Sequence, residues 1–332
     1  MMRIKIVDPL TYFSTEKLKE KIIEHYYPPN FPFFFTYHSL QTLFAYIVKK
    51  ENILGEIAMV KIGRILHVER ILLDEGENEL ESILSLINTF ATNYLKAQEV
   101  RYYVLKEVSG DIFFPGSNTV IGSLIPTKYY PLFKKKQFLE IDCRIGYQIK
   151  SLKDVADVDT SDINLSIGME PKRYYEFHGI PNYPVNFIHE IYGKLLSPNF
   201  FVLKAAFKNR DIALFHWYPN YYRLLKDNPM ILFSDMNENQ ISEIIQRLKE
   251  AKIFKILFHP NILGKIDLRI VLATIKAVLD FLHEQFGIKH IQIGNFNPFT
   301  ESYLTSALQE LGMTPIYEFR TFSWCTGGVC DG

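Results

Sequence analysis

The chain has 332 residues, of which 48% are hydrophobic and 22% charged, and 37 Lys and Arg residues balance 37 Asp and Glu residues. This length favours two domains with a sizeable core, and the balanced charge lacks the basic excess expected of a nucleic-acid-binding protein. No stretch approaches the roughly 20 apolar residues of a membrane span, and the first residues lack the apolar core of a secretion signal. We therefore expect a cytoplasmic protein with neither a nucleic-acid nor a membrane partner.

The first half of the sequence predicts a helix, a meander of three strands and a second, longer helix. The three strand-like segments are separated by Glu51-Asn52 and by Gly63, where hairpin turns are natural. The predicted elements are a helix over 14–27, strands over 43–48, 53–61 and 64–73, and an amphipathic helix over 78–97. Hairpin connections make these strands antiparallel.

A strand over 101–106, a helix over 127–136 and a strand that ends at Lys150 close the first half. In the last strand apolar residues at 141, 143, 145, 147 and 149 alternate with polar residues and a glycine. This alternation predicts one buried and one solvated face.

The second half repeats this order of elements. Its predicted elements are a helix over 185–195, strands over 200–208 and 211–218, a strand pair at 221–226 and 230–233, a helix over 238–251 and a strand over 253–259. Helix, strand, helix and strand then follow from Asp267 to Trp324, as they do from Asn78 to Lys150. We predict a mixed α+β fold of two similar domains, 1–150 and 163–325, joined by the polar linker 151–162.

The three cysteines give little evidence of a metal site. Cys143 is expected to be a buried thiol in a strand. Cys325 and Cys330 lie in the short loop CTGGVC, which can close a disulfide, offer two metal ligands or stay reduced. Because two cysteines make an incomplete zinc site and no His or Glu pair has metal-ligand spacing, we expect no metal.

The order of elements resembles that of the Gcn5-related N-acetyltransferases (GNAT), and in particular tandem members similar to mycothiol synthase. The resemblance covers most of both halves and is carried by three segments: NILGKIDLRIVLATIKAVLDFLHEQFGIKHIQI, ESYLTSALQELGM and YYPLFKKKQFLEI. The family places a glycine loop at the start of a long helix, and here Asn261, Gly264 and Ile266 occupy its three characteristic places. A tyrosine of the family is replaced by Leu308 in the second half and by Phe133 in the first.

The resemblance implies an acyl-CoA, most simply acetyl-CoA, bound where the long helix of the second half begins. A helix start offers free backbone amides and a partial positive charge to phosphate groups. The predicted cofactor-binding residues are Asn261, Leu263, Gly264, Lys265, Ile266 and Arg269, together with Asn295 at the end of the next strand. Asp267 opposes an anion unless it caps the helix, and an ordinary strand-to-helix turn is the alternative for the whole loop.

The two halves differ at this helix start. The first half has LDEGENELE there, with carboxylates at 74, 75, 77, 79 and 81. Such carboxylates stabilise the helix dipole but repel a phosphate. We therefore expect only the second half to bind an acyl-CoA.

Acyl transfer to an amine needs a base for the amine and an acid for the leaving thiolate. His259, at the end of the strand before the glycine loop, is the candidate base, and Glu69 is its analogue in the first half. Tyr303 is the candidate acid. The alternative for all three is a structural side chain.

Together these features predict an acyl-CoA-dependent N-acyltransferase, most simply an N-acetyltransferase, that acts on a small-molecule or peptide amine. The alternative is a non-catalytic binding or scaffolding protein that kept the fold without the cofactor site. A third hypothesis, an aminoacyl transferase that uses a charged tRNA, requires a basic channel that the neutral composition does not indicate.

Overall fold

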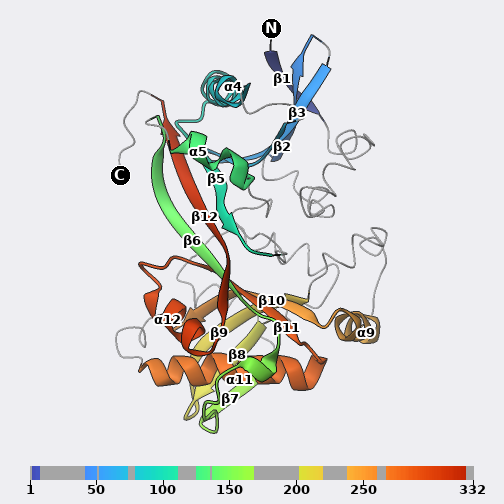
Figure 1. Cartoon of the computed structure of the whole chain (residues 1–332), viewed down its shortest axis with the longest axis vertical. Helices are drawn as coiled ribbons and strands as arrows, with labels where there is room; N and C mark the ends of the chain where they lie inside the picture. Colours follow the sequence, from blue (N-terminus) through green and yellow to red (C-terminus); the bar gives the residue numbers. More distant parts are fainter. Residues whose placement is uncertain are drawn as a thin grey trace. The chain divides into compact units, whose positions relative to one another are not determined.

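The computed structural model (Figure 1) describes residues 2–7, 42–50, 52–73, 79–110, 125–134, 137–167, 202–219, 238–259 and 267–326. The chain forms two compact units. The first comprises Met1–Gly110, Phe114–Arg144 and Tyr317–Gly332, and the second comprises Asp111–Phe113 and Ile145–Ile316. The division of the sequence at 1–150 and 163–325 stays a prediction.

The first half contains the predicted meander and helix. Its elements are β1 (Met2–Val7), β2 (Thr42–Lys49), β3 (Asn52–Ile62), β4 (Ile65–Leu73), α4 (Leu80–Asn93), β5 (Glu99–Val108), η3 (Thr127–Tyr129), α5 (Tyr130–Phe133) and β6 (Leu139–Ile149). The helix predicted over 14–27 lies outside the described residues. The short strand β1 pairs antiparallel with β2 and was not predicted.

The second half repeats these elements. They are η4 (Leu152–Asp154), β7 (Ile163–Ile167), β8 (Val202–Phe207), β9 (Arg210–Pro219), α9 (Glu238–Leu248), β10 (Glu250–Phe258), α11 (Leu268–Phe286), β11 (His290–Phe296), α12 (Ser302–Glu310) and β12 (Thr314–Cys325). The elements predicted over 185–195, 221–226 and 230–233 lie outside the described residues. None of the described helices combines the length and apolar character needed to cross a bilayer.

Each unit contains a mixed sheet with one parallel pair. In the first unit the strand order is β1-β2-β3-β4-β5-β12, with β6 next to β12, and β4 runs parallel to β5. In the second unit the order is β7-β8-β9-β10-β11-β6, and β10 runs parallel to β11. The predicted mixed α+β fold with mostly antiparallel sheets is therefore confirmed.

The last strand of each sequence half contributes to the other unit. The C-terminal strand β12 pairs antiparallel with β5, from Cys325 opposite Glu99 to Tyr317 opposite Val108. The C-terminal part of β6 pairs with β11, with Ile149 opposite Ile291. Neither unit is therefore built from one half of the sequence alone.

Aromatic packing anchors β12 in the first unit. Phe322 is 1% exposed, and its ring stacks on Phe133 with centroids 5.5 Å apart. Phe133 also packs against Tyr102 of β5 and against Phe138. The helix α4 buries five residues of its predicted apolar stripe, whereas Tyr94, which was also predicted to belong to it, is 75% exposed. The buried residues are Leu80, Ile83, Leu84, Ile87 and Ala91. The C-terminal strand is thus part of the core of the first unit.

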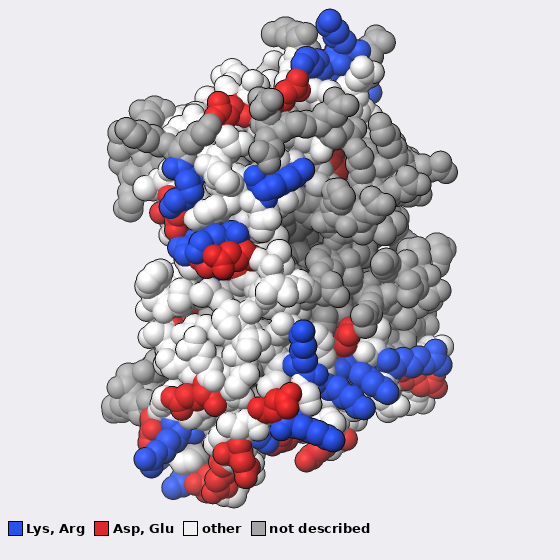
Figure 2. Space-filling model, in the orientation of Figure 1, with Lys and Arg blue, Asp and Glu red and all other residues white. Residues whose placement is uncertain are grey.

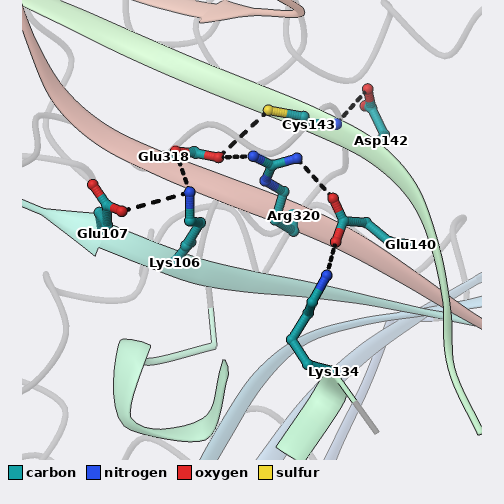
Figure 3. Close-up of polar contacts among 8 residues, drawn as sticks. All are labelled: Lys106, Glu107, Lys134, Glu140, Asp142, Cys143, Glu318 and Arg320. Atoms are coloured by element: carbon teal, nitrogen blue, oxygen red, sulfur yellow. Dashed lines mark hydrogen bonds and ion pairs between the residues drawn. The ribbon is translucent and has the colours of Figure 1, made fainter. Parts of the chain in front are cut away.

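A network of charged side chains lies on both sides of β12 (Figure 3). Arg320 donates to Glu140 of β6 at 2.7 Å and also pairs with Glu318 of its own strand. Lys106 of β5 donates to Glu318 at 3.1 Å, and Lys134 donates to Glu140 at 2.9 Å. Each carboxylate therefore has two cationic partners, which connect β5, β12, β6 and the residue after α5.

In the second unit α11 is the principal helix (Figure 1). Asp267 caps its start, because the carboxylate accepts a hydrogen bond from the Arg269 backbone at 3.0 Å. Gly287, with φ of +66°, ends the helix in the left-handed region that favours glycine. Phe286 of α11 packs on the fully buried Trp217 of β9, with centroids 5.1 Å apart.

The predicted alternation of β6 is only partly correct. Cys143, Tyr147 and Ile149 are buried as predicted, but Ile141 is 41% exposed and Gln148 is only 7% exposed. The strand contributes residues to both units. A single two-sided pattern cannot describe a strand whose two ends lie in different surroundings.

Candidate active site

The parallel strands β10 and β11 form a fork in the second unit. They pair over four residues, from Glu250 opposite His290 to Ile253 opposite Ile293. Both strands continue, β10 to Phe258 and β11 to Phe296, but beyond this point they pair with β9 and β6 instead of each other. We call this opening the β10–β11 fork.

Irregular pairing on both arms accompanies the opening. The register between β10 and β9 shifts between Ile253 and Lys255, so that Phe254 is an extra residue. The register between β11 and β6 shifts between Ile293 and Phe296. Such bulges bend a strand and increase its twist. The inner backbone edges of the two arms are consequently left without each other as hydrogen-bond partners.

Two helices begin at the open end of the fork. The carboxyl ends of parallel strands meet at one edge of a sheet, and α11 follows β10 while α12 follows β11. The two helices contact each other. The N-terminus of α11, with its partial positive charge, therefore lies beside the opening.

The predicted loop residues Asn261, Leu263, Gly264, Lys265 and Ile266 lie outside the described residues. Arg269 is exposed in the first turn of α11, and its side chain forms no ion pair within the described part of the chain. Asn295 lies on the β11 arm, two residues beyond the last pair with β10, and is 9% exposed.

The predicted base follows β10, and the predicted acid packs against the last residue of that strand. His259 follows the last residue of β10, and its backbone amide donates to the Ile212 carbonyl at 2.8 Å. The Tyr303 ring lies edge-on to Phe258, the residue before His259, with centroids 6.0 Å apart. Burial raises the pKa of Tyr303 to about 12. The phenol is therefore protonated at neutral pH and is a proton donor.

The first unit contains a fork of the same kind between β4 and β5. Its four pairs run from Ile65 opposite Glu99 to Val68 opposite Tyr102, and both strands then continue. The register between β3 and β4 skips Glu69, which therefore occupies the bulge position that Phe254 has in the second unit. Glu69 and His259 thus belong to different units.

Equivalent positions of the two forks carry a buried basic residue that the sequence analysis missed. Lys252 and His67 each occupy the third of the four pairs, and they are 1% and 8% exposed. Burial lowers the pKa of Lys252 to about 7. The Nδ1 atom of His67 lies 2.8 Å from the Tyr103 hydroxyl, and burial, assisted by Arg101, lowers the pKa of His67 to about 4. The available signal was a basic residue with an apolar residue on either side, Lys252 between Ala251 and Ile253 and His67 between Leu66 and Val68.

The positions where the family pattern has a tyrosine are apolar and buried. Leu308 and Phe133 are both 0% exposed. Tyr303, one turn or more earlier on α12, is the tyrosine whose ring packs against Phe258 at the end of β10.

The two described cysteines, Cys143 and Cys325, belong to the first unit and not to this fork. Burial raises the pKa of Cys143 to about 11, and its Sγ atom lies 3.7 Å from Glu318 Oε1. Cys325 is disulfide-bonded, whereas Cys330 lies outside the described residues. In the described ranges, no three His, Cys, Asp or Glu residues are grouped so that they could hold a metal ion.

Charges of both signs are interspersed on the molecular face drawn in Figure 2. Among the described residues on that face, Lys and Arg lie next to Asp and Glu and form no continuous stripe. This pattern is typical of an ordinary solvated surface.

Three solved structures are similar to almost the whole chain. A tandem GNAT protein from the clavulanic acid biosynthesis pathway has a TM-score of 0.60 and 8% identity, over 100% of both chains. A GCN5-related N-acetyltransferase from Sphaerobacter thermophilus has a TM-score of 0.56 and 9% identity, over 97% of this chain and 95% of that one. A GNAT-family acetyltransferase from Colwellia psychrerythraea has a TM-score of 0.55 and 11% identity, over 97% and 99%.

No family model and no curated protein sequence matches the chain. At identities of 8% to 11% the likeness concerns the fold alone. The repeated meander and the long helix that follows it in each half are features that the sequence analysis associated with this family. The chain has the tandem GNAT fold.

Proposed function

We propose that the chain is an acyl-CoA-dependent N-acyltransferase whose donor site is the β10–β11 fork. The observation that carries this proposal is the separation of the two strands beside the start of α11. The pantetheine arm of an acyl-CoA contains amides, which can pair with backbone groups of the two arms where the strands no longer pair with each other. Its phosphates fit the amides of a helix start. The residues present therefore fit the group.

The end of β10 supplies the groups that acyl transfer needs. A bound acyl-CoA would contribute the acyl group as a thioester. Tyr303 holds its proton at neutral pH, since its pKa is raised to about 12, and can donate that proton to a leaving thiolate. We assign His259 as the acceptor of the proton from the attacking amine. Asn295 on the β11 arm and Arg269 on α11 are assigned to binding of the donor.

The β4–β5 fork is less suited to an anionic donor. The sequence before α4 is acidic from Asp74 to Glu79, and Glu79 pairs with Lys49 of β2. At the start of α11, by contrast, the Asp267 carboxylate caps the helix. The proposal keeps the predicted acceptor, a small-molecule or peptide amine in the cytoplasm.

One observation favours a second function, that of a non-catalytic binding or scaffolding protein. Leu308 and Phe133 fill the places where the family pattern has a tyrosine, and both are fully buried. Under this alternative Tyr303 is a packing residue and the fork binds no acyl-CoA.

Thermal unfolding with millimolar acetyl-CoA separates the two functions. We expect acetyl-CoA to raise the Tm of the wild type and of Gly76→Glu, but not that of Gly264→Glu. The two variants place one carboxylate at matched positions of the two halves, so each is the other's control. No rise for the wild type would refute the proposed function, and loss of the rise in Gly76→Glu alone would assign the site to the β4–β5 fork.

A further inference from the structure

The loop between β11 and α12 exposes a large aromatic side chain. Phe299 is 76% exposed, and no other large hydrophobic residue in the described part of the chain is more exposed. Full burial of a Phe side chain contributes roughly 1.5–3 kcal/mol. At Phe299 most of this free energy remains available to a ligand.

The loop 297–301 fixes the backbone that carries this ring. Asn297 accepts hydrogen bonds from the backbone amides of Phe299 at 2.9 Å and Thr300 at 3.1 Å. Glu301 accepts one from the Asn297 amide at 2.8 Å. A ligand that contacts Phe299 therefore has little backbone entropy to remove on binding.

The loop lies at the same edge of the sheet as the start of α11. It begins directly after β11, one arm of the β10–β11 fork, whereas α11 follows β10, the other arm. The helices α11 and α12 are in contact and both begin at this edge. Phe299 and the exposed Arg269 thus lie in the segments that follow the two arms of the fork.

An acyl-CoA has two chemically different ends, a pantetheine arm with the thioester and an adenosine that carries phosphates. If the arm lies in the fork and the diphosphate lies at the start of α11, the adenosine must remain outside the opening. A purine base has a flat π face that stacks on aromatic side chains, and a phosphate on the ribose matches a guanidinium. An aromatic side chain and a cation near the opening therefore match the base and the ribose phosphate of such a nucleotide.

We propose that Phe299 stacks on the purine base of the donor, so that the loop 297–301 recognises the nucleotide end of the acyl-CoA. This inference rests on the proposed function of the β10–β11 fork. Phe299 belongs neither to the predicted glycine loop nor to the candidate acid and base, so this contact with the purine base is an additional one. The chemistry that it identifies is an adenine nucleotide joined to a pantetheine arm.

The test compares two probes by isothermal titration, CoA and 4'-phosphopantetheine, which has the arm and one phosphate but no adenosine. Phe299→Ala should bind CoA about five- to 150-fold more weakly than the wild type, because a base stacked on an aromatic contributes roughly 1–3 kcal/mol. Its affinity for 4'-phosphopantetheine should be unchanged. Phe299→Trp should bind CoA as well as the wild type does.

Tyr94→Ala is the matched control, because Tyr94 is 75% exposed at the end of α4 in the first unit. Its affinity for both probes should equal that of the wild type. Unchanged CoA binding by Phe299→Ala, or an equal loss for both probes, would overturn the inference and leave the donor site in place. A wild type that binds neither probe would overturn both the inference and the proposed function.

Discussion

The two forks have the same backbone and different chemistry. In each, a parallel pair separates after four residues and a bulge lies just beyond the last pair. At equivalent positions, however, the β4–β5 fork has His67 and Glu69 where the β10–β11 fork has Lys252 and Phe254. Both forks therefore bury a basic residue at the same position, but this residue is a histidine in the first unit and a lysine in the second.

Replacement of the buried lysine gives the largest expected effect. Burial lowers the pKa of Lys252 from 10.5 to about 7. Between these values the unfolded chain binds a proton that the folded chain does not, so stability rises with pH. Relative to Lys252→Met, the free energy of unfolding of the wild type should rise by about 5 kcal/mol across this window.

Urea unfolding at a series of pH values measures this difference, with Trp217 fluorescence in a Trp324→Phe background as the probe of the second unit. Parallel pH profiles for the lysine and methionine proteins would show that Lys252 is not buried as described.

The second largest effect concerns β12, which comes from the second half of the sequence but belongs mostly to the first unit. Phe322 belongs to the second half of the sequence but packs in the core of the first unit, where it is 1% exposed. Phe322→Ala should lower the free energy of unfolding by about 3–5 kcal/mol. The change should appear in Trp324 fluorescence, measured in a Trp217→Phe background.

Leu308→Ala is the control for Phe322→Ala, because Leu308 is fully buried on α12 in the second unit. It should change the transition reported by Trp217. If Phe322→Ala left the Trp324 transition unchanged, Phe322 would not be part of the core of the first unit.

The histidine of the first fork should titrate in another window. Burial and Arg101 lower the pKa of His67 from 6.5 to about 4. Between these values the unfolded chain again binds the extra proton, so stability falls as the pH falls. Relative to His67→Gln, the wild type should lose about 3 kcal/mol of unfolding free energy between pH 6.5 and pH 4.

Trp324 fluorescence reports this loss, and His283→Gln, which replaces a histidine of α11 in the second unit, serves as the control. The control should keep the wild-type profile at Trp324. If the free energy of unfolding of His67→Gln fell with pH as steeply as that of the wild type, the pKa of His67 would not be lowered by burial.

The charge network on β12 should contribute the least. Arg320→Met removes the bridge between Glu318 and Glu140, but Lys106 and Lys134 still neutralise these carboxylates. We expect a loss of about 1 kcal/mol in the free energy of unfolding at low salt, which shrinks at high salt.

Arg144→Met is the comparison for this network, because Arg144 pairs with Asp142 of its own strand, β6, at 2.8 Å. Its effect on the Trp324 transition should be smaller. Equal effects of the two variants would show that the charge network does not stabilise β12 in the first unit.

Sequence patterns predicted most of the described elements, because the periodicity of apolar residues depends only on residues that are close together in the sequence. The meander of β2, β3 and β4 and the helices α4 and α11 agree with their predicted positions to within a few residues. The edge strands β1 and β7 were missed, since five or six residues give little periodicity. The helix predicted over 127–136 is shorter in the structure, with η3 and α5 ending at Phe133.

The candidate site was predictable in part. His259 and Tyr303 were chosen separately. His259 follows β10, and the Tyr303 ring packs against Phe258, the last residue of β10, while their roles stay predictions. The cap formed by Asp267 was anticipated as one of two roles. Lys252 and His67 were missed, because burial of an isolated basic residue depends on the elements that cover it and not on its neighbours in sequence.

The sequence by itself determined the order of elements and the internal repeat, because both follow from turn residues and from hydrophobic periods of two or 3.6 residues. Only the tertiary structure decided which strands are neighbours. The pairing of β12 with β5 joins residues more than 200 positions apart, and no local pattern in either strand specifies that partner. The separation of β10 from β11 has the same physical origin, since it depends on the registers that each strand adopts with β9 and β6.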